Sequence, residues 1–109
     1  YLSKKSTQFL MGVLYSTSTG PNKLVEQLPK NAKIAHKTGS SGKNKDGLTG
    51  AENDIAIITL PNGKHYAISV FVSDSKESET VNCKMISDIS KVVYDGLSNP
   101  KKGFFFNWK

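Results

Sequence analysis

The sequence predicts an α/β chain of the α+β sandwich type, in which an antiparallel sheet is flanked by an N-terminal and a C-terminal helix. Residues 54–60 and 65–73 are rich in β-branched and aromatic side chains, and the turn between them contains Asn-Gly, which is typical of a hairpin. Apolar residues recur at helical spacing near both ends of the chain. A chain of 109 residues is long enough for one small domain with one core, or for a piece of a larger domain.

The first helix is expected over residues 2–16, where apolar and polar residues separate onto opposite faces. The apolar face consists of Leu2, Phe9, Leu10, Val13 and Leu14. A Thr-Ser-Thr-Gly-Pro run then breaks the pattern. Residues 22–28 are expected to form a short second helix that ends at Pro29.

A strand with an apolar lead-in is expected next, and the seven residues from His36 onward form its exit into a polar loop. Alternate side chains of a strand share a face, so Lys37 and Gly39 should point one way, and His36, Thr38 and Ser40 the other. Gly39 would let a ligand lie close to the backbone, and an open strand edge can bind a planar amide. A cation and two hydroxyl groups could hold a carboxylate beside it. These residues therefore indicate a site for an acylated, anionic, peptide-like ligand.

Residues 42–52 are rich in Gly, Lys and Asn and nearly free of apolar side chains, so they are expected to be a mobile loop beside the strand's exit. The two hairpin strands that follow are almost continuously apolar. Such strands are typical of a sheet that is covered on both faces.

The C-terminal helix is expected to begin after Asp74, which stands at capping-box spacing from Glu77. Asn99-Pro100 should stop this helix near Leu97. One face carries an apolar stripe that is expected to contact the core, and it consists of Val81, Met85, Ile89, Val92 and Val93.

Residues 99–109 differ in composition from the rest of the chain. Three phenylalanines and a tryptophan stand among lysines there, which could touch a membrane surface or stack on bases. We favour a basic, aromatic and disordered tail, because so short a segment has no fold to present these side chains.

The charge and the cysteine count exclude several classes of function. The formal charge of +6 comes from lysine without any arginine, which argues against specific phosphate or guanine recognition and hence against a nucleic-acid partner. Cys83 is the only cysteine, so no intrachain disulfide forms and zinc-type patterns are excluded. His65 has no ligand partner at suitable spacing, and we expect neither a metal nor a cofactor. No export signal and no membrane-length apolar run are recognised within the chain.

Lys-Thr-Gly at 37–39 is one of three motifs of class A β-lactamases and penicillin-binding proteins, beside Ser-x-x-Lys and Ser-Asp-Asn. The chain resembles class A serine β-lactamases over most of its length. The resemblance runs through Thr19-Gly20, Leu28-Pro29, residues 35–40, 53–58, 60–63 and 70–72, and the terminal helix.

The Ser-x-x-Lys nucleophile element, the Ser-Asp-Asn motif and the Ω-loop glutamate of the family are expected to be absent. Residues 1–98 therefore resemble the C-terminal part of a β-lactamase/transpeptidase-like domain without its catalytic serine.

The resemblance implies roles for the residues at the strand's exit. Lys37 would attract the substrate carboxylate and orient the hydroxyl that passes a proton to the lactam nitrogen, and Thr38 and Ser40 would bind that carboxylate. The Ser40 backbone N–H would form half of the oxyanion hole, together with the N–H of the absent nucleophile. Gly39 would keep the strand edge open, and Ser41 would shape the rim.

Two further residues near this site are assigned no catalytic role. In the family, a basic residue near the short helix often helps to hold the carboxylate, and Lys23 matches that place only loosely. A surface role is therefore expected for Lys23. His36 lies on the opposite face from Lys37 and is not expected to be catalytic.

The function implied for the parent enzyme is hydrolysis of the β-lactam amide, and thus antibiotic resistance. The parent would lie in the periplasm or be secreted, and the partners of this chain would be a β-lactam substrate and the missing N-terminal part. The chain alone is expected to be inactive, because it has no positioned serine. The alternatives are a fragment of a penicillin-binding transpeptidase, a non-catalytic truncated product, and a basic binding module.

Overall fold

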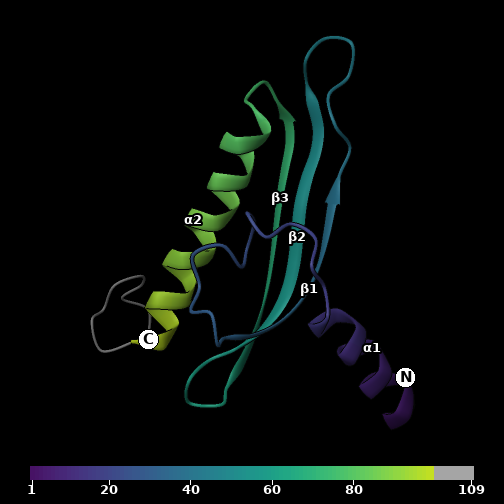
Figure 1. Cartoon of the computed structure of the whole chain (residues 1–109), viewed down its shortest axis with the longest axis vertical. Helices are drawn as coiled ribbons and strands as arrows, with labels where there is room; N and C mark the ends of the chain where they lie inside the picture. Colours follow the sequence, from purple (N-terminus) through teal and green to yellow (C-terminus); the bar gives the residue numbers. More distant parts are fainter. Residues whose placement is uncertain (100–109) are drawn as a thin grey trace.

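A computed structural model describes residues 1–99 of the chain. The element order is α1 (Lys4–Tyr15), β1 (Lys33–Ser40), β2 (Thr49–Thr59), β3 (His65–Ser75) and α2 (Glu79–Ser98). The strands form one antiparallel sheet in the order β1-β2-β3, with α2 lying along one face (Figure 1). The predicted sheet with a helix at each end is thus confirmed.

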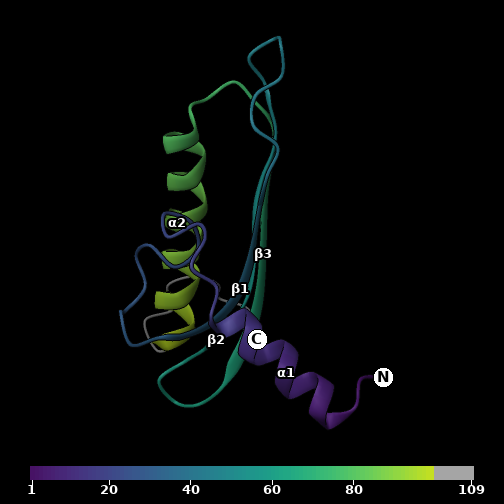
Figure 2. The ribbon, with the colours of Figure 1, turned by 45° about the vertical axis from the view of Figure 1, so that its right-hand side comes forward.

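The first helix forms as expected but is poorly covered. Ser3 caps α1 by accepting the N–H of Ser6 on its side chain, and none of the helix residues is buried. Phe9 is 75% exposed. Figure 2 shows that α1 projects away from the side of the sheet where α2 lies. The apolar face predicted for α1 is therefore mostly exposed within residues 1–99, and Leu14 is its partly covered member.

The short second helix predicted at 22–28 is wrong, because this segment folds as successive turns. Its backbone hydrogen bonds join residues three apart, as in the N–H of Lys23 to the Gly20 carbonyl. The N–H of Leu24 instead donates to Asp54 Oδ2 at 3.1 Å, so a buried carboxylate replaces a helical partner. Gly20 has φ +61°, and a Cβ there would lie 2.5 Å from Thr38 Cγ2, so the turn needs glycine.

The predicted hairpin is confirmed, and its first strand is longer than expected. β2 pairs with β3 from Thr49 opposite Ser75 to Thr59 opposite His65. Residues 49–52, which were assigned to the mobile loop, are the start of β2, and Thr49 and Glu52 are buried. The low apolar content of this stretch concealed the strand, because its buried side chains are polar.

The described residues cover mainly one face of the sheet. The core lies on that face, beneath α2 and the turns before β1, and consists of Leu24, Leu28, Ala56, Ile58, Leu60, Ile86 and Tyr94. On the other face Ile55, Ile57 and Phe71 are 44%, 38% and 67% exposed. The prediction of a sheet covered on both faces is therefore wrong for residues 1–99.

The C-terminal helix begins later and packs with a different face than predicted. Ser78, rather than Asp74, is its N-cap and accepts the N–H of Val81. The apolar stripe points outward, with Ile89 46% exposed. The buried residues are Asn82, Cys83, Ile86, Ser87, Ser90, Tyr94 and Gly96.

The reason for this orientation lies in the turns before β1. Their carbonyl groups lack helical partners, and polar residues of α2 satisfy some of them, as when Ser90 Oγ donates to the Leu24 carbonyl at 2.7 Å. An apolar face could not make such bonds.

The tail predicted at 99–109 lies outside the described residues, except for Asn99, whose N–H donates to the Asp95 carbonyl. Among residues 1–99, no helix has the length and apolar character to cross a membrane.

Candidate functional site

Four of the predicted site residues lie on β1, which forms one edge of the sheet, and Ser41 directly follows the strand. The four are Lys37, Thr38, Gly39 and Ser40. The alternation of their side chains is as expected. His36 and Ser40 bond to Asp54 and Glu52 on the face that α2 covers. Lys37 lies on the opposite face and is exposed.

The backbone of β1 presents one N–H of particular interest. Ser41 donates its N–H to the Ala51 carbonyl on β2 at 2.9 Å. Successive peptide groups of a strand point to opposite sides, so the N–H of Ser40 points away from β2, toward the open edge. At the same edge the His36 carbonyl accepts the Thr17 hydroxyl at 2.6 Å. The loop before β1 thus covers the start of this edge.

The side chains of Lys37 and Thr38 make few contacts. Lys37 Nζ donates to the Thr38 carbonyl at 2.7 Å, and Thr38 Oγ1 lies 2.8 Å from Thr19 Oγ1. Lys37 also borders a cavity of about 190 Å³ between α1 and the uncovered sheet face. Leu14 and Ile57 line the same cavity. The side chains of Lys37 and Thr38 thus lie on opposite faces of the sheet, at its edge strand.

Lys23 is not the surface lysine that was expected. Its side chain is 6% exposed, and Nζ lies 2.6 Å from Glu52 Oε1. Nζ also donates to the carbonyl groups of Gly39 at 3.0 Å and Asn53 at 3.2 Å. The other Glu52 oxygen accepts the Ser40 hydroxyl at 3.0 Å. Sequence reasoning missed this cluster because its members lie far apart in the chain.

A second buried pair ties the strands to the preceding turns. His36 Nδ1 lies 3.1 Å from Asp54 Oδ1, and the side chains are 4% and 0% exposed. The other Asp54 oxygen accepts the N–H of Leu24. This pair joins β1, β2 and the turns before β1, so it fixes the position of the strand's exit.

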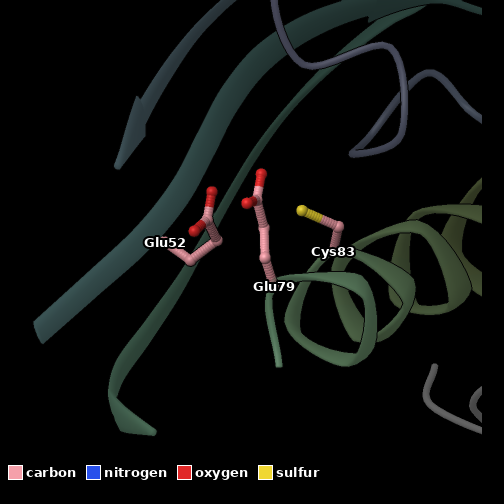
Figure 3. Close-up of side chains that lie close together, drawn as sticks. All are labelled: Glu52, Glu79 and Cys83. Atoms are coloured by element: carbon pink, nitrogen blue, oxygen red, sulfur yellow. The ribbon is translucent and has the colours of Figure 1, made fainter. Parts of the chain in front are cut away.

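Glu52 also lies near Glu79 and Cys83, as Figure 3 shows, with their potential ligand atoms all within 4.8 Å of one another. Burial raises the pKa of the Cys83 thiol, and the Glu52 charge raises it further. A neutral thiol is a poor metal ligand, and Glu52 already binds a lysine. This donor set therefore fits a polar junction at the start of α2 better than a metal centre.

The expectation that the chain lacks Ser-x-x-Lys spacing is wrong at the level of the sequence. A lysine stands three positions after each of Ser40, Ser73 and Ser98, which is Ser-x-x-Lys spacing. Lys43, which follows Ser40, donates to the carbonyl groups of Gly47 and Glu77, and Ser40 donates to Glu52. Lys101, which follows Ser98, lies outside the described residues. Ser73 is in β3, which ends at Ser75, so Lys76 lies beyond the strand, and no hydrogen bond joins these two side chains. Neither pair has the arrangement of a nucleophile with its activating lysine.

Comparison with known proteins supplies the family. A family model described as the beta-lactamase enzyme family matches residues 1–97. Beta-lactamase VEB-1 of Pseudomonas aeruginosa is 52% identical over 98 residues, which are 90% of this chain and 32% of the relative. Extended-spectrum beta-lactamase PER-1 of the same organism is 42% identical over 93 residues, 85% of this chain and 30% of the relative.

Solved structures agree with this result. TLA-3 extended-spectrum beta-lactamase superposes with a TM-score of 0.88 at 55% identity, covering 89% of this chain and 35% of that structure. A class A beta-lactamase from Bacteroides cellulosilyticus gives a TM-score of 0.87 at 42% identity, covering 90% of this chain and 35% of the other. The chain thus spans about a third of the length of these relatives.

Proposed function

The chain belongs to the beta-lactamase enzyme family, and we propose that it is the C-terminal part of a class A serine β-lactamase, contributing the strand that binds the substrate carboxylate and the oxyanion. The observation that carries the proposal is the outward-pointing Ser40 N–H on the open edge of β1, beside the Lys37-Thr38-Gly39 motif. Residues 1–98 form this part of the domain, and the serine belongs to the missing N-terminal part.

The hydrogen-bond inventory supports a division of roles among the site residues. Thr38 and Thr19 share one bond between two hydroxyl groups, so one of the two protons is free to bind a carboxylate. The Ser40 hydroxyl proton goes to Glu52, so the backbone N–H is the better donor of this residue. Among residues 1–99, Lys37 Nζ donates to a carbonyl group and forms no ion pair, so its positive charge can attract the substrate carboxylate. Gly39 and Ser41 shape the strand edge and its rim.

The reaction proceeds through an acyl-enzyme. The serine attacks the β-lactam carbonyl, and charge develops on its oxygen in the tetrahedral transition state. The Ser40 N–H donates to this oxyanion, and a donor of this kind is worth about 3 kcal/mol in comparable hydrolases. The tetrahedral species collapses as the amide C–N bond breaks, the lactam nitrogen takes up a proton, and the acyl group stays on the serine as an ester. Water then attacks the ester carbonyl, which frees the serine hydroxyl and releases the ring-opened acid. The parent enzyme confers antibiotic resistance from the periplasm or the extracellular medium.

A complementation experiment tests this proposal. The chain is mixed with the separately expressed N-terminal part of VEB-1, which is the portion that this chain does not match. We call the resulting complex the reassembled protein. Hydrolysis of a chromogenic cephalosporin should appear in the complex, and neither part alone should show it. Lys30 is exposed, so Lys30→Met is the matched control and should leave the rate unchanged.

Two outcomes would contradict the proposal. One is a complex that forms by size-exclusion chromatography and melts cooperatively but hydrolyses no cephalosporin. This outcome favours a non-catalytic product or a transpeptidase fragment. The other is hydrolysis by the chain alone.

A further inference from the structure

We infer that Lys23 is a positioning residue for the Ser40 N–H, and that Glu52 holds it in this role. Lys23 donates to the carbonyl oxygen of Gly39, and this carbonyl belongs to the same peptide group as the Ser40 N–H. This inference rests on the proposed function, because the Ser40 N–H matters for catalysis only if it meets the oxyanion.

The first step is that Lys23 has no donor left for a ligand. An ammonium group has three protons and accepts no hydrogen bond. The Lys23 ammonium has three acceptors, Glu52 Oε1 at 2.6 Å and the carbonyl groups of Gly39 at 3.0 Å and Asn53 at 3.2 Å. With the side chain 6% exposed, Lys23 acts within the protein rather than on a substrate carboxylate.

The second step concerns the peptide group between Gly39 and Ser40. A trans peptide is planar, so its C=O and its N–H point in opposite directions. The pairing of β1 with β2 sets the direction of this peptide group, and the bond from Lys23 to the Gly39 oxygen restrains that direction further, and with it the direction of the Ser40 N–H. A cation at the oxygen also draws electron density away from the nitrogen, which makes the N–H a stronger donor.

The third step is the role of Glu52. Its two oxygens bind Lys23 and the Ser40 hydroxyl, so one ion pair holds both the peptide before Ser40 and its side chain. The Glu52 side chain is 3% exposed. Without Lys23 it would be a buried charge with no cationic partner in this cluster, which would distort the strand around Ser40.

The backbone before Lys23 is built to admit this side chain. A Cβ at Gly20 would lie 3.2 Å from Lys23 Cδ as well as 2.5 Å from Thr38 Cγ2. The glycine therefore lets the stem of Lys23 pass between the turn and β1. This close fit supports a fixed position for the ammonium group.

The kinetic test uses the reassembled protein and separates positioning from substrate binding. Lys23→Met should lower kcat for the chromogenic cephalosporin about ten- to a hundredfold, with KM within about threefold, because the oxyanion exists only in the transition state. Lys23→Arg keeps the cation and should retain most of kcat. The double variant Lys23→Met/Glu52→Gln removes the uncompensated charge and should recover part of the loss. Lys30→Met is the control.

A raised KM with unchanged kcat would overturn the inference and assign Lys23 to the substrate carboxylate. Unchanged kinetics in Lys23→Met would overturn it as well, while leaving the proposed function intact.

A second measurement does not depend on activity. In ¹H–¹⁵N spectra of the reassembled protein, Lys23→Met should shift the Ser40 amide resonance, whereas Lys30→Met should not. If the wild-type complex proved inactive, the proposed function would fail, but these spectra would still test the contact. A Ser40 amide that does not respond to Lys23→Met would contradict the inference.

Discussion

Asp54 should be the most sensitive single position for the stability of the fold. Its carboxylate is 0% exposed, and it accepts the N–H of Leu24 and contacts His36 Nδ1, each at 3.1 Å. Asp54→Ala removes both contacts and leaves a buried N–H and a buried imidazole without these partners. Leaving a buried donor without its acceptor costs about 1–3 kcal/mol, so the two losses together should cost about 3–5 kcal/mol.

This loss is a large part of the 5–15 kcal/mol by which a domain is typically stable. Urea unfolding of the reassembled protein, followed by circular dichroism, measures it directly. With a urea dependence of about 1–3 kcal/mol per molar, the midpoint should fall by at least about 1 M. Asp54→Asn keeps an acceptor for Leu24 and should lose less.

Asp46 lies exposed in the turn before β2, so Asp46→Ala is the control and should change the midpoint little. If Asp54→Ala lowered the free energy of unfolding by less than about 1 kcal/mol, the buried pair would not be the tie between strands and turns that we describe.

Three further predictions concern other parts of the chain. The isolated chain should be partly unfolded or self-associating, because Ile57 and Phe71 are exposed on a sheet face and β3 is an edge strand within residues 1–99. A cooperative thermal transition from a strictly monomeric sample would count against this. In the reassembled protein, kcat/KM should fall from the wild type to Lys37→Arg and further to Lys37→Ala, with about a ten- to hundredfold loss for alanine and nearly unchanged melting temperatures. Full catalytic efficiency in Lys37→Ala would remove the 37–40 segment from the carboxylate site. Burial, followed by the charges of Tyr94 and Asp95, raises the pKa of Tyr66 from 10.0 to about 12. Between pH 10 and pH 12 the folded state therefore holds a proton that the unfolded state has lost, so the free energy of unfolding should decline as the pH rises through this range. Tyr66→Phe should flatten that decline in denaturation curves measured across this pH range. An unchanged dependence of the free energy of unfolding on pH would argue against this role of Tyr66.

The sequence predicted the elements that depend on local patterns. Runs rich in β-branched and aromatic residues, together with the Asn-Gly turn, identified the hairpin. The apolar spacing identified α1 within two residues of its bounds. The Lys-Thr-Gly motif indicated which strand carries the site, because the chain resembles class A β-lactamases over most of its length.

The sequence failed where long-range polar contacts determine the structure. The inward face of α2 is polar because Ser90 satisfies a carbonyl group in turns some sixty residues earlier, which no helical periodicity reveals. The same limit applies to Lys23 and Glu52, since a lysine in a polar turn and a glutamate in a Gly- and Asn-rich stretch both suggest surface. Only the fold brings these two side chains together beneath Ser40.

The central claim is that the Ser40 N–H stabilises the oxyanion of β-lactam hydrolysis. A crystal structure of the reassembled protein with a boronic acid bound to its serine tests this most directly, because the tetrahedral boronate mimics the transition state. A boronate oxygen should lie about 2.7–3.1 Å from the Ser40 nitrogen. A boronate bound to the serine whose oxygens all lie beyond about 3.5 Å from that nitrogen would contradict the account.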